Sequence, residues 1–247
     1  MCILVTSEEK LKKEKELIEE LLKKYKNIKT IIKNINTKNT NVILGEKNIN
    51  LYGDGYIQDK LGEYTFKISA NSFYQVNPTQ TEKLYALAVK EAKIKETDTI
   101  LDLYCGIGTI GIFASKQAKK VYGIEIVKQA IENAKENSKI NKIKNTEFIS
   151  GDVEQILDKL IQKEKITPNI IFVDPPRKGL DNNTINNLIK ITPEKIIYIS
   201  CNPATLARDL SKLEEKYKIE KITPVDMFPW TSHVECCSVL YLKDTIQ

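Results

Sequence analysis

The sequence predicts an α/β protein with a doubly wound, mostly parallel seven-stranded sheet, preceded by a small appendage of one helix and antiparallel strands. Two observations lead to this prediction. After about residue 78, strand-like apolar runs alternate with helix-like segments, and the loops between them are short. Such alternation is typical of parallel sheets covered by helices. In addition, residues 106–111 have the GxGxxG spacing of a strand-to-helix turn at a nucleotide site.

The first part of the chain, residues 1–68, is interpreted as the appendage. Residues 7–25 have apolar side chains on one helical face, and Ser7 is a suitable N-cap, so a helix is expected there. Short strand-like runs separated by Asn and Gly turns follow the helix. These strands are expected at 28–35, 41–45, 49–52, 56–60 and 63–69.

The second part, residues 69–247, supplies the main sheet. Its strands are expected at 98–103, 120–125, 146–150, 169–173, 195–200, about 221–226 and 237–242. Its helices are expected at 79–93, 109–117, 127–140, 153–163, 181–190 and 203–217. The last two strands leave no room for a helix between them, so they should form a hairpin that adds one antiparallel strand to the sheet.

Composition narrows the class of protein. The 247 residues are 41% hydrophobic and 29% charged with a formal net charge of +5, which is typical of a soluble globular protein and permits an anionic partner. No apolar run approaches the roughly 18 residues of a membrane helix, and no secretory signal is visible. The five cysteines are odd in number and irregularly spaced, which argues against a disulfide framework and favours the reducing cytoplasm. They include no CxxC pair, which argues against a structural zinc or iron–sulfur site. The oligomeric state is not readable.

The loop after the first strand of the main sheet is the predicted nucleotide site. Gly106, Gly108 and Gly111 allow a tight turn that opens a helix with its N-terminus facing a ligand. Glu125 ends the next strand, about 20 positions on, where a carboxylate can accept hydrogen bonds from ribose hydroxyls. These features fit a nicotinamide dinucleotide and S-adenosylmethionine equally.

Two further carboxylates favour S-adenosylmethionine. Asp102 lies at the end of the first strand, where it would repel a pyrophosphate but suit the amino group of a sulfonium ligand. Asp152 follows the third strand and is placed for an adenine amino group. Together with Glu125 they suit a cationic cofactor better than a dianionic one. Cys105, beside the turn, is expected to fill space.

The fourth strand ends in the segment Asp174-Pro175-Pro176-Arg177, at the edge of the sheet where ligands bind in such folds. Amine methyltransferases place a similar tetrad there but usually end it in an aromatic residue that stacks on the base. Arg177 in place of the aromatic residue argues against amine methylation.

Cys201 is the candidate nucleophile. It follows the fifth strand, and Asn202 and Pro203 are suited to the first positions of the next helix. The helix dipole is therefore expected to stabilise the thiolate and to lower the pKa of the thiol. The alternative is a small buried apolar side chain.

Glu235, at the start of the last strand, is the candidate general base, and the alternative is a surface carboxylate. His233 is the only histidine, and a structural, hydrogen-bonded role is favoured for it. A methyl donor, an activated cysteine and a carboxylate base together suggest methylation of carbon-5 of uracil. Addition of the thiolate at carbon-6 activates carbon-5, and a base then removes the carbon-5 proton so that the thiolate can leave.

Five segments carry a resemblance to a known family: NSFYQVN (71–77), LDLYCGIGTIG (101–111), DPPRKGL (174–180), SCNP (200–203) and FPWTSHVEC (228–236). Over roughly residues 64–243 the chain resembles the RNA uracil-5 methyltransferases, which make 5-methyluridine in tRNA and ribosomal RNA. The resemblance implies a class I methyltransferase (Rossmann-like) domain over residues 69–247, with S-adenosylmethionine as the methyl donor and RNA as the partner.

The resemblance also implies roles for single residues. Cys201 would be the nucleophile, Glu235 the base, and Asp174 a ligand of the target uracil or of the cofactor. The cofactor site would be formed by Gln75, Asp102, Tyr104, Gly106, Gly108, Thr109, Glu125, Asp152 and Asp174. The substrate would be contacted by Phe73, Gln75, Asp174 and Arg177. Family members often carry Asn at the position of Thr109.

The chain also departs from this family. Full-length relatives begin with a small β-barrel RNA-binding domain, and many carry a four-cysteine iron–sulfur site upstream. This chain has neither, and residues 1–68 resemble the tail of the central RNA-contacting domain. The chain is therefore expected to be a catalytic fragment or a natural short paralogue, in either case with reduced RNA affinity. Two alternatives stay open: a truncated protein that binds S-adenosylmethionine and RNA with little activity, and a cytosine-5 RNA methyltransferase. Which RNA and which uridine are not readable.

Overall fold

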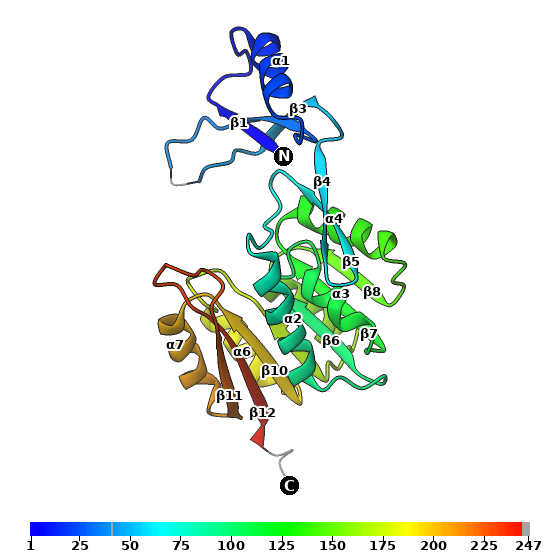
Figure 1. The fold of residues 1–247 in the computed structure, drawn as a ribbon. Helices are drawn as coiled ribbons and strands as arrows, with labels where there is room; N and C mark the ends of the chain where they lie inside the picture. Colours follow the sequence, from blue (N-terminus) through cyan, green and yellow to red (C-terminus); the bar gives the residue numbers. More distant parts are fainter. Residues whose placement is uncertain (41, 244–247) are drawn as a thin grey trace. The chain divides into compact units, whose positions relative to one another are not determined.

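The computed structural model describes residues 1–40 and 42–243. Its contacts divide the chain into two compact units (Figure 1). The first unit comprises residues 1–59 and 66–72, and the second comprises residues 60–65 and 73–247. The boundary after residue 68 drawn from the sequence stays a prediction.

The first unit contains a three-stranded sheet and one helix. Strand β2 (Ile31–Ile35) lies in the middle, parallel to β1 (Cys2–Thr6) and antiparallel to β3 (Lys47–Tyr52). The expectation of a purely antiparallel sheet is therefore wrong. The first residues of the chain join it as a parallel strand, because the intervening helix α1 (Glu14–Lys24) provides the crossover that parallel pairing needs.

Helix α1 begins later than the sequence predicts, and Ser7 is not its N-cap. The buried amino group of Lys33 accounts for this difference, because it donates to the carbonyl oxygen of Glu9 and to the carboxylate of Glu14. The contact with Glu9 engages a backbone carbonyl oxygen within residues 7–25, the segment predicted to be helical. Lys13 then takes a left-handed conformation (φ 57°) at the N-cap position.

The strand predicted at 41–45 does not form over residues 42–45, and residue 41 lies outside the described residues. In this segment the backbone forms hydrogen bonds with side-chain amides rather than with a neighbouring strand. Asn34 exchanges two hydrogen bonds with the backbone of Gly45, at 2.7 and 2.9 Å. Asn36 donates to the carbonyl oxygens of Val42 and Ile43. Local side-chain bonds of this kind compete with strand pairing.

Strands β4 (Tyr56–Leu61) and β5 (Tyr64–Ser69) form a separate two-stranded sheet. The turn between them contains Gly62 at φ +59°. Residues 60–65 at this turn belong to the second unit, and the other ends of both strands belong to the first.

The second unit has the predicted doubly wound sheet, which confirms the fold class. Its seven strands lie in the order β11-β12-β10-β9-β6-β7-β8, and β12 is the strand that runs antiparallel to its neighbours. The strands are β6 (Thr99–Leu103), β7 (Lys120–Glu125), β8 (Thr146–Ser150), β9 (Ile170–Val173), β10 (Lys195–Ser200), β11 (Tyr217–Val225) and β12 (Glu235–Leu242).

Helices cover both faces of this sheet (Figure 1). One face carries α2 (Pro78–Ala92), α3 (Thr109–Ser115) and α4 (Lys128–Ile140). The other carries α5 (Val153–Asp158) with its π-helical continuation (Lys159–Lys163), α6 (Asn182–Ile191) and α7 (Pro203–Leu213). Helix α7 ends four residues before the predicted end at 217, because Tyr217 begins β11 and its buried hydroxyl donates to the carbonyl oxygen of Pro193.

The strand order reverses between β9 and β6, which places the predicted site at one edge of the sheet. The loops after β6, β7, β9 and β10 leave the carboxyl ends of parallel strands, and ligands bind at this edge in open α/β sheets. Strand β12 starts at the same edge, because its antiparallel register pairs Cys236 with Ser200, the last residue of β10.

Candidate functional site

The turn after β6 is built as the GxGxxG spacing predicts. Tyr104, Gly106 and Gly108 all have positive φ angles, and α3 begins at Thr109. A Cβ atom on Gly108 would lie 2.7 Å from the ring of Phe148, so this position requires glycine for contact as well as for conformation. Gly111 similarly lets α3 approach the end of β6, where an added Cβ would lie 3.0 Å from Asp102 Oδ2.

Asp102 is fully buried beneath this turn. Its Oδ2 accepts a hydrogen bond from the backbone N–H of Gly111 at 2.8 Å, so the carboxyl group braces the start of α3. Oδ1 has no hydrogen-bond donor among the described residues. Burial raises the pKa of Asp102 to about 7, and the Gly111 hydrogen bond opposes this rise.

Glu125 and Asp152 have backbone partners in the next two loops. The Glu125 carboxylate accepts from the N–H of Gly106 at 3.2 Å and from that of Val127 at 2.9 Å, which ties the first two loops together. Asp152 caps α5 by accepting from the N–H groups of Glu154 and Gln155. This capping role was not predicted from the sequence, although an Asp one residue before a helix is a common signal for it.

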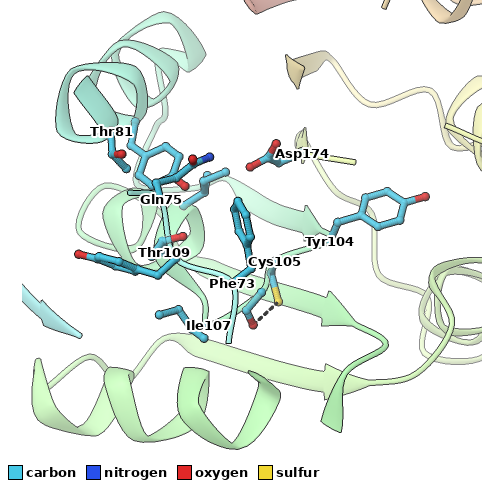
Figure 2. Close-up of a pocket in the computed structure, with 12 residues that line it drawn as sticks. Phe73, Gln75, Thr81, Tyr104, Cys105, Ile107, Thr109 and Asp174 are labelled. Atoms are coloured by element: carbon cyan, nitrogen blue, oxygen red, sulfur yellow. Dashed lines mark hydrogen bonds between the residues drawn. The ribbon is translucent and has the colours of Figure 1, made fainter. Parts of the chain in front are cut away.

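A hollow lies beside the turn (Figure 2). Six predicted site residues line it: Phe73, Gln75, Tyr104, Gly106, Thr109 and Asp174. Phe73 and Asp174 approach it from opposite sides, and Tyr104 points its ring away, with its hydroxyl 3.4 Å from Thr184 Oγ1. Asp102, Gly108, Glu125 and Asp152 lie outside the lining and support the loops around it.

The two lining residues that α2 supplies, Thr81 and Tyr85, were not predicted from the sequence. Tyr85 is buried next to the Thr109 side chain. Burial and the nearby carboxylate of Asp174 raise the pKa of Tyr85. A hydroxyl on the apolar face of a predicted helix is the signal that could have found this residue. Cys105 is buried beside the turn, as expected, and burial raises its pKa well above its ordinary value.

Cys201 and Glu235 lie next to each other at the ends of β10 and β12. Ser200 pairs with Cys236 in the antiparallel register, so the residue after Ser200 and the residue before Cys236 are neighbours across the two strands. Glu235 is 3% exposed, and its burial raises the pKa of its carboxyl group. Asn202 and Pro203 begin α7 as predicted, and the Asn202 side chain accepts from the N–H of Ala204.

The expectation of a lowered pKa at Cys201 is wrong. Burial raises the pKa of this thiol first, and the negative charges of Glu235 and Asp174 raise it further. The guanidinium of Arg177 opposes both effects at Cys201 and also lowers the pKa of Glu235. The structure therefore brings together three side chains that can be negatively charged, those of Cys201, Glu235 and Asp174, and the cation of Arg177. Asp174 also lines the hollow.

The segment that carries Asp174 and Arg177 is held by α7. Asn202 and Thr205 both donate to the carbonyl oxygen of Arg177 at 3.2 Å. Arg208 donates to the carbonyl oxygens of Lys178 and Leu180. These contacts fix the backbone beside Cys201, and the sequence analysis missed them.

The buried carboxylate of Asp209 also holds this segment against α7, and these contacts together form the anchor on α7. Asp209 accepts from the hydroxyl of Tyr198 at 2.7 Å, from the N–H of Leu180 at 2.8 Å and from the Arg208 guanidinium. The signal for the anchor was available, because Arg208 is one of only two arginines in a chain with 38 basic residues.

Comparison with known proteins decides the family of the chain. The model of the tRNA (uracil-5-)-methyltransferase family matches residues 4–243. The chain belongs to the tRNA (uracil-5-)-methyltransferase family. This membership confirms the resemblance found in the sequence.

Similar proteins include uncharacterized RNA methyltransferases of two bacteria. The protein of Clostridium acetobutylicum is 51% identical over 95% of this chain and 51% of its own length. That of Bacillus cereus is 48% identical over 98% of this chain and 53% of its own length. The chain therefore spans about half the length of the curated relatives that it matches.

The structure of Pyrococcus abyssi tRNA (uracil-54, C5)-methyltransferase in complex with S-adenosyl-L-homocysteine is also similar. It has a TM-score of 0.73 and 31% identity, over 96% of this chain and 55% of the Pyrococcus chain. The Methanocaldococcus jannaschii tRNA m1G37 methyltransferase, at 18% identity and a TM-score of 0.63, shares the fold.

Within the described ranges, 1–40 and 42–243, no group of three or more His, Cys, Asp and Glu side chains could hold a metal ion. The same residues include no helix that is long and apolar enough to cross a membrane. All five cysteines are free thiols.

Proposed function

We propose that this chain is the catalytic part of an RNA (uracil-5-)-methyltransferase, which transfers a methyl group from S-adenosylmethionine to carbon-5 of a uridine. The observation that carries the proposal is the adjacency of Cys201 and Glu235, with Asp174 and Arg177 beside them. The family of the chain supports uracil as the base and favours a tRNA over a ribosomal RNA. A cytoplasmic location belongs to the same proposal.

The hollow beside the GxGxxG turn suits S-adenosylmethionine. Its walls are largely apolar and aromatic, and Gln75, Thr109 and Asp174 add polar groups, a combination typical of small-molecule sites. When bound, S-adenosylmethionine supplies an electrophilic methyl group. Glu125, Asp152 and the glycines of the turn stay predicted cofactor residues.

Cys201 and Glu235 would act on the uracil ring. The thiolate of Cys201 forms a bond to carbon-6, which turns carbon-5 into a nucleophile that takes the methyl group. Glu235 then accepts the proton that carbon-5 still carries, the bond between sulfur and carbon-6 breaks, and the thiolate is restored. The charge of Arg177 would stabilise the Cys201 thiolate before it adds to carbon-6 and the Glu235 carboxylate before it accepts the proton.

A covalent-trapping experiment tests this assignment. RNA that contains 5-fluorouridine has no carbon-5 proton for a base to remove, so the wild-type protein with S-adenosylmethionine should accumulate a covalent adduct detectable by mass spectrometry. Cys201→Ala should form none. Glu235→Gln should form an adduct even with ordinary uridine, because proton removal is blocked. An adduct that persists in Cys201→Ala would overturn the nucleophile assignment.

The same reaction mixtures separate the alternatives. Cofactor binding by calorimetry without methyl transfer to any RNA would identify a binding protein. Labelled 5-methylcytidine in place of 5-methyluridine would identify a cytosine-5 methyltransferase.

A further inference from the structure

Trp230 stands on the loop that leads into Glu235. Residues 226–234 join β11 to β12, and the pairing of Val225 with Glu235 closes the loop at its base. The Trp230 side chain is fully exposed, with a relative accessibility of 103%. Its backbone has a φ angle of 70°, in the left-handed region. Both properties are unusual for a bulky apolar residue.

Hydrogen bonds inside the loop hold this conformation. The backbone N–H and the hydroxyl of Thr231 both donate to the carbonyl oxygen of Phe228, and the N–H of His233 donates to Thr231 Oγ1. Met227 is fully buried, and its carbonyl oxygen accepts from the side chain of Asn77 at 3.0 Å. The loop is therefore anchored, and it presents the indole ring to solvent. Backbone strain that the surrounding contacts maintain is typical of functional sites.

The loop is connected to the reacting groups. The Phe228 ring packs edge-on against His233, with 6.4 Å between the centroids. His233 Nε2 lies 3.5 Å from Arg177 Nη2, and the charge of Arg177 acts on Cys201 and Glu235. Trp230 thus lies two residues from Phe228 and three from His233, on the loop that contacts this site.

We propose that Trp230 stacks on a nucleobase that neighbours the target uridine in the RNA. This inference rests on the proposed function. Cys201 and Glu235 can act on uracil only when the base is unstacked from its neighbours. A neighbouring base then has a free aromatic face, and a rigidly presented indole ring can cover it. Such stacking accepts any base and is a general mode of binding single-stranded RNA.

The charges beside the loop fit the same partner. Arg177 and Lys178 are both exposed on the segment that follows Asp174. They add two cations for the phosphate groups that flank the flipped nucleotide. An apolar protein partner would match the indole ring but not these cations.

The single tryptophan of the chain makes stacking directly measurable, because all indole fluorescence comes from Trp230. We would titrate the protein with unmodified tRNA transcripts and follow the emission. Stacking should quench the fluorescence in a saturable manner. Trp230→Ala should raise the KM for RNA roughly tenfold, whereas Trp230→Phe should stay within about threefold because a flat ring remains. Ile222→Ala is the matched control, since Ile222 is 48% exposed on β11 and should leave KM unchanged.

The outcomes separate this inference from the proposed function. Unquenched emission at saturating RNA, together with an unchanged KM in Trp230→Ala, would overturn the stacking role whatever reaction the protein catalyses. If no RNA is methylated, but RNA still quenches Trp230 and binds Trp230→Ala roughly tenfold more weakly, stacking stands and the proposed reaction fails. Circular dichroism of each variant confirms that it is folded.

Discussion

Cys201 and Glu235 are neighbours across two antiparallel strands, because Ser200 of β10 pairs with Cys236 of β12. The two residues are 34 positions apart in the sequence, and the hairpin of β11 and β12 brings them together. Since each can be negatively charged, the ionisation of one opposes that of the other.

This coupling predicts opposite effects of two substitutions on the Cys201 thiol. Glu235→Gln removes a negative charge and should lower the pKa of Cys201, whereas Arg177→Gln removes a positive charge and should raise it. At pH 7.5 the rate of alkylation by iodoacetamide should rise roughly threefold in the first variant and fall by a similar factor in the second. The measurement is mass spectrometry of the Cys201 peptide.

The alkylation experiment has a built-in control. A Cys2→Ser background removes the other partly exposed thiol, since Cys105, Cys236 and Cys237 are buried. Because the pKa of Cys201 lies above the ordinary thiol value of 9.0, its rate should increase with pH throughout the neutral range. Equal rates in both variants would contradict the coupling.

Asp102 should make the stability of the protein depend on pH. Its pKa is about 7 in the folded state against an ordinary value of 3.8, so the folded state holds a proton that the unfolded state releases. The stabilisation is complete below pH 3.8 and is lost as the pH rises towards and through 7. One pKa unit corresponds to about 1.4 kcal/mol, so the loss amounts to a few kcal/mol.

Asp102→Asn tests this linkage, because an amide keeps an acceptor for Gly111 but does not ionise. Urea unfolding at pH 5 and pH 8 should show a smaller decrease in the free energy of unfolding for the variant than for the wild type. Equal decreases in both proteins would show that Asp102 is not the titrating group.

Gly179 should be essential to the anchor on α7. It has a φ angle of +74°, and a Cβ atom there would lie 2.4 Å from Asp209 Oδ2. Gly179→Ala should therefore destabilise the protein by about 3 kcal/mol or more, from backbone strain and from displacement of the buried carboxylate.

Gly62→Ala is the matched control, because φ is +59° there but the nearest atom would be 3.5 Å away. It should cost only about 1–2 kcal/mol. Similar unfolding free energies for the two variants would argue against the anchor.

Tyr85→Phe should weaken cofactor binding. The buried hydroxyl of Tyr85 lies beside Thr109 in the lining of the hollow, and a hydrogen bond from it to the cofactor would be worth about 1 kcal/mol, or roughly fivefold in affinity. Calorimetry with S-adenosylhomocysteine measures this change. Tyr217→Phe also removes a buried, hydrogen-bonded hydroxyl, but this hydroxyl bonds to Pro193 and lies outside the lining, so affinity should be unaffected. An unchanged affinity in Tyr85→Phe would place the cofactor elsewhere.

Local patterns were enough to predict the main sheet and the loops at its edge. Strands β7, β8 and β10 have the predicted bounds, and Gly106, Gly108 and Asn202 play the conformational parts that their types suggest. These features depend on a few consecutive residues, so the sequence carries them directly.

Features that depend on distant residues were missed. The start of α1 is set by Lys33, which contacts Glu9 and Glu14 from another strand. Burial and the carboxylates of Glu235 and Asp174 raise the pKa of Cys201, and neither carboxylate is near Cys201 in the sequence. Tyr85 was also missed, because its place in the lining depends on how α2 packs beside the loop after β6.

The most direct test of the proposed function is the identity of the methylated nucleoside. The protein would be incubated with labelled S-adenosylmethionine and unmodified tRNA and ribosomal RNA, followed by digestion and chromatography. We expect labelled 5-methyluridine from the wild type and none from Cys201→Ala. Label in any other nucleoside, or 5-methyluridine that still forms without the Cys201 thiol, would contradict it.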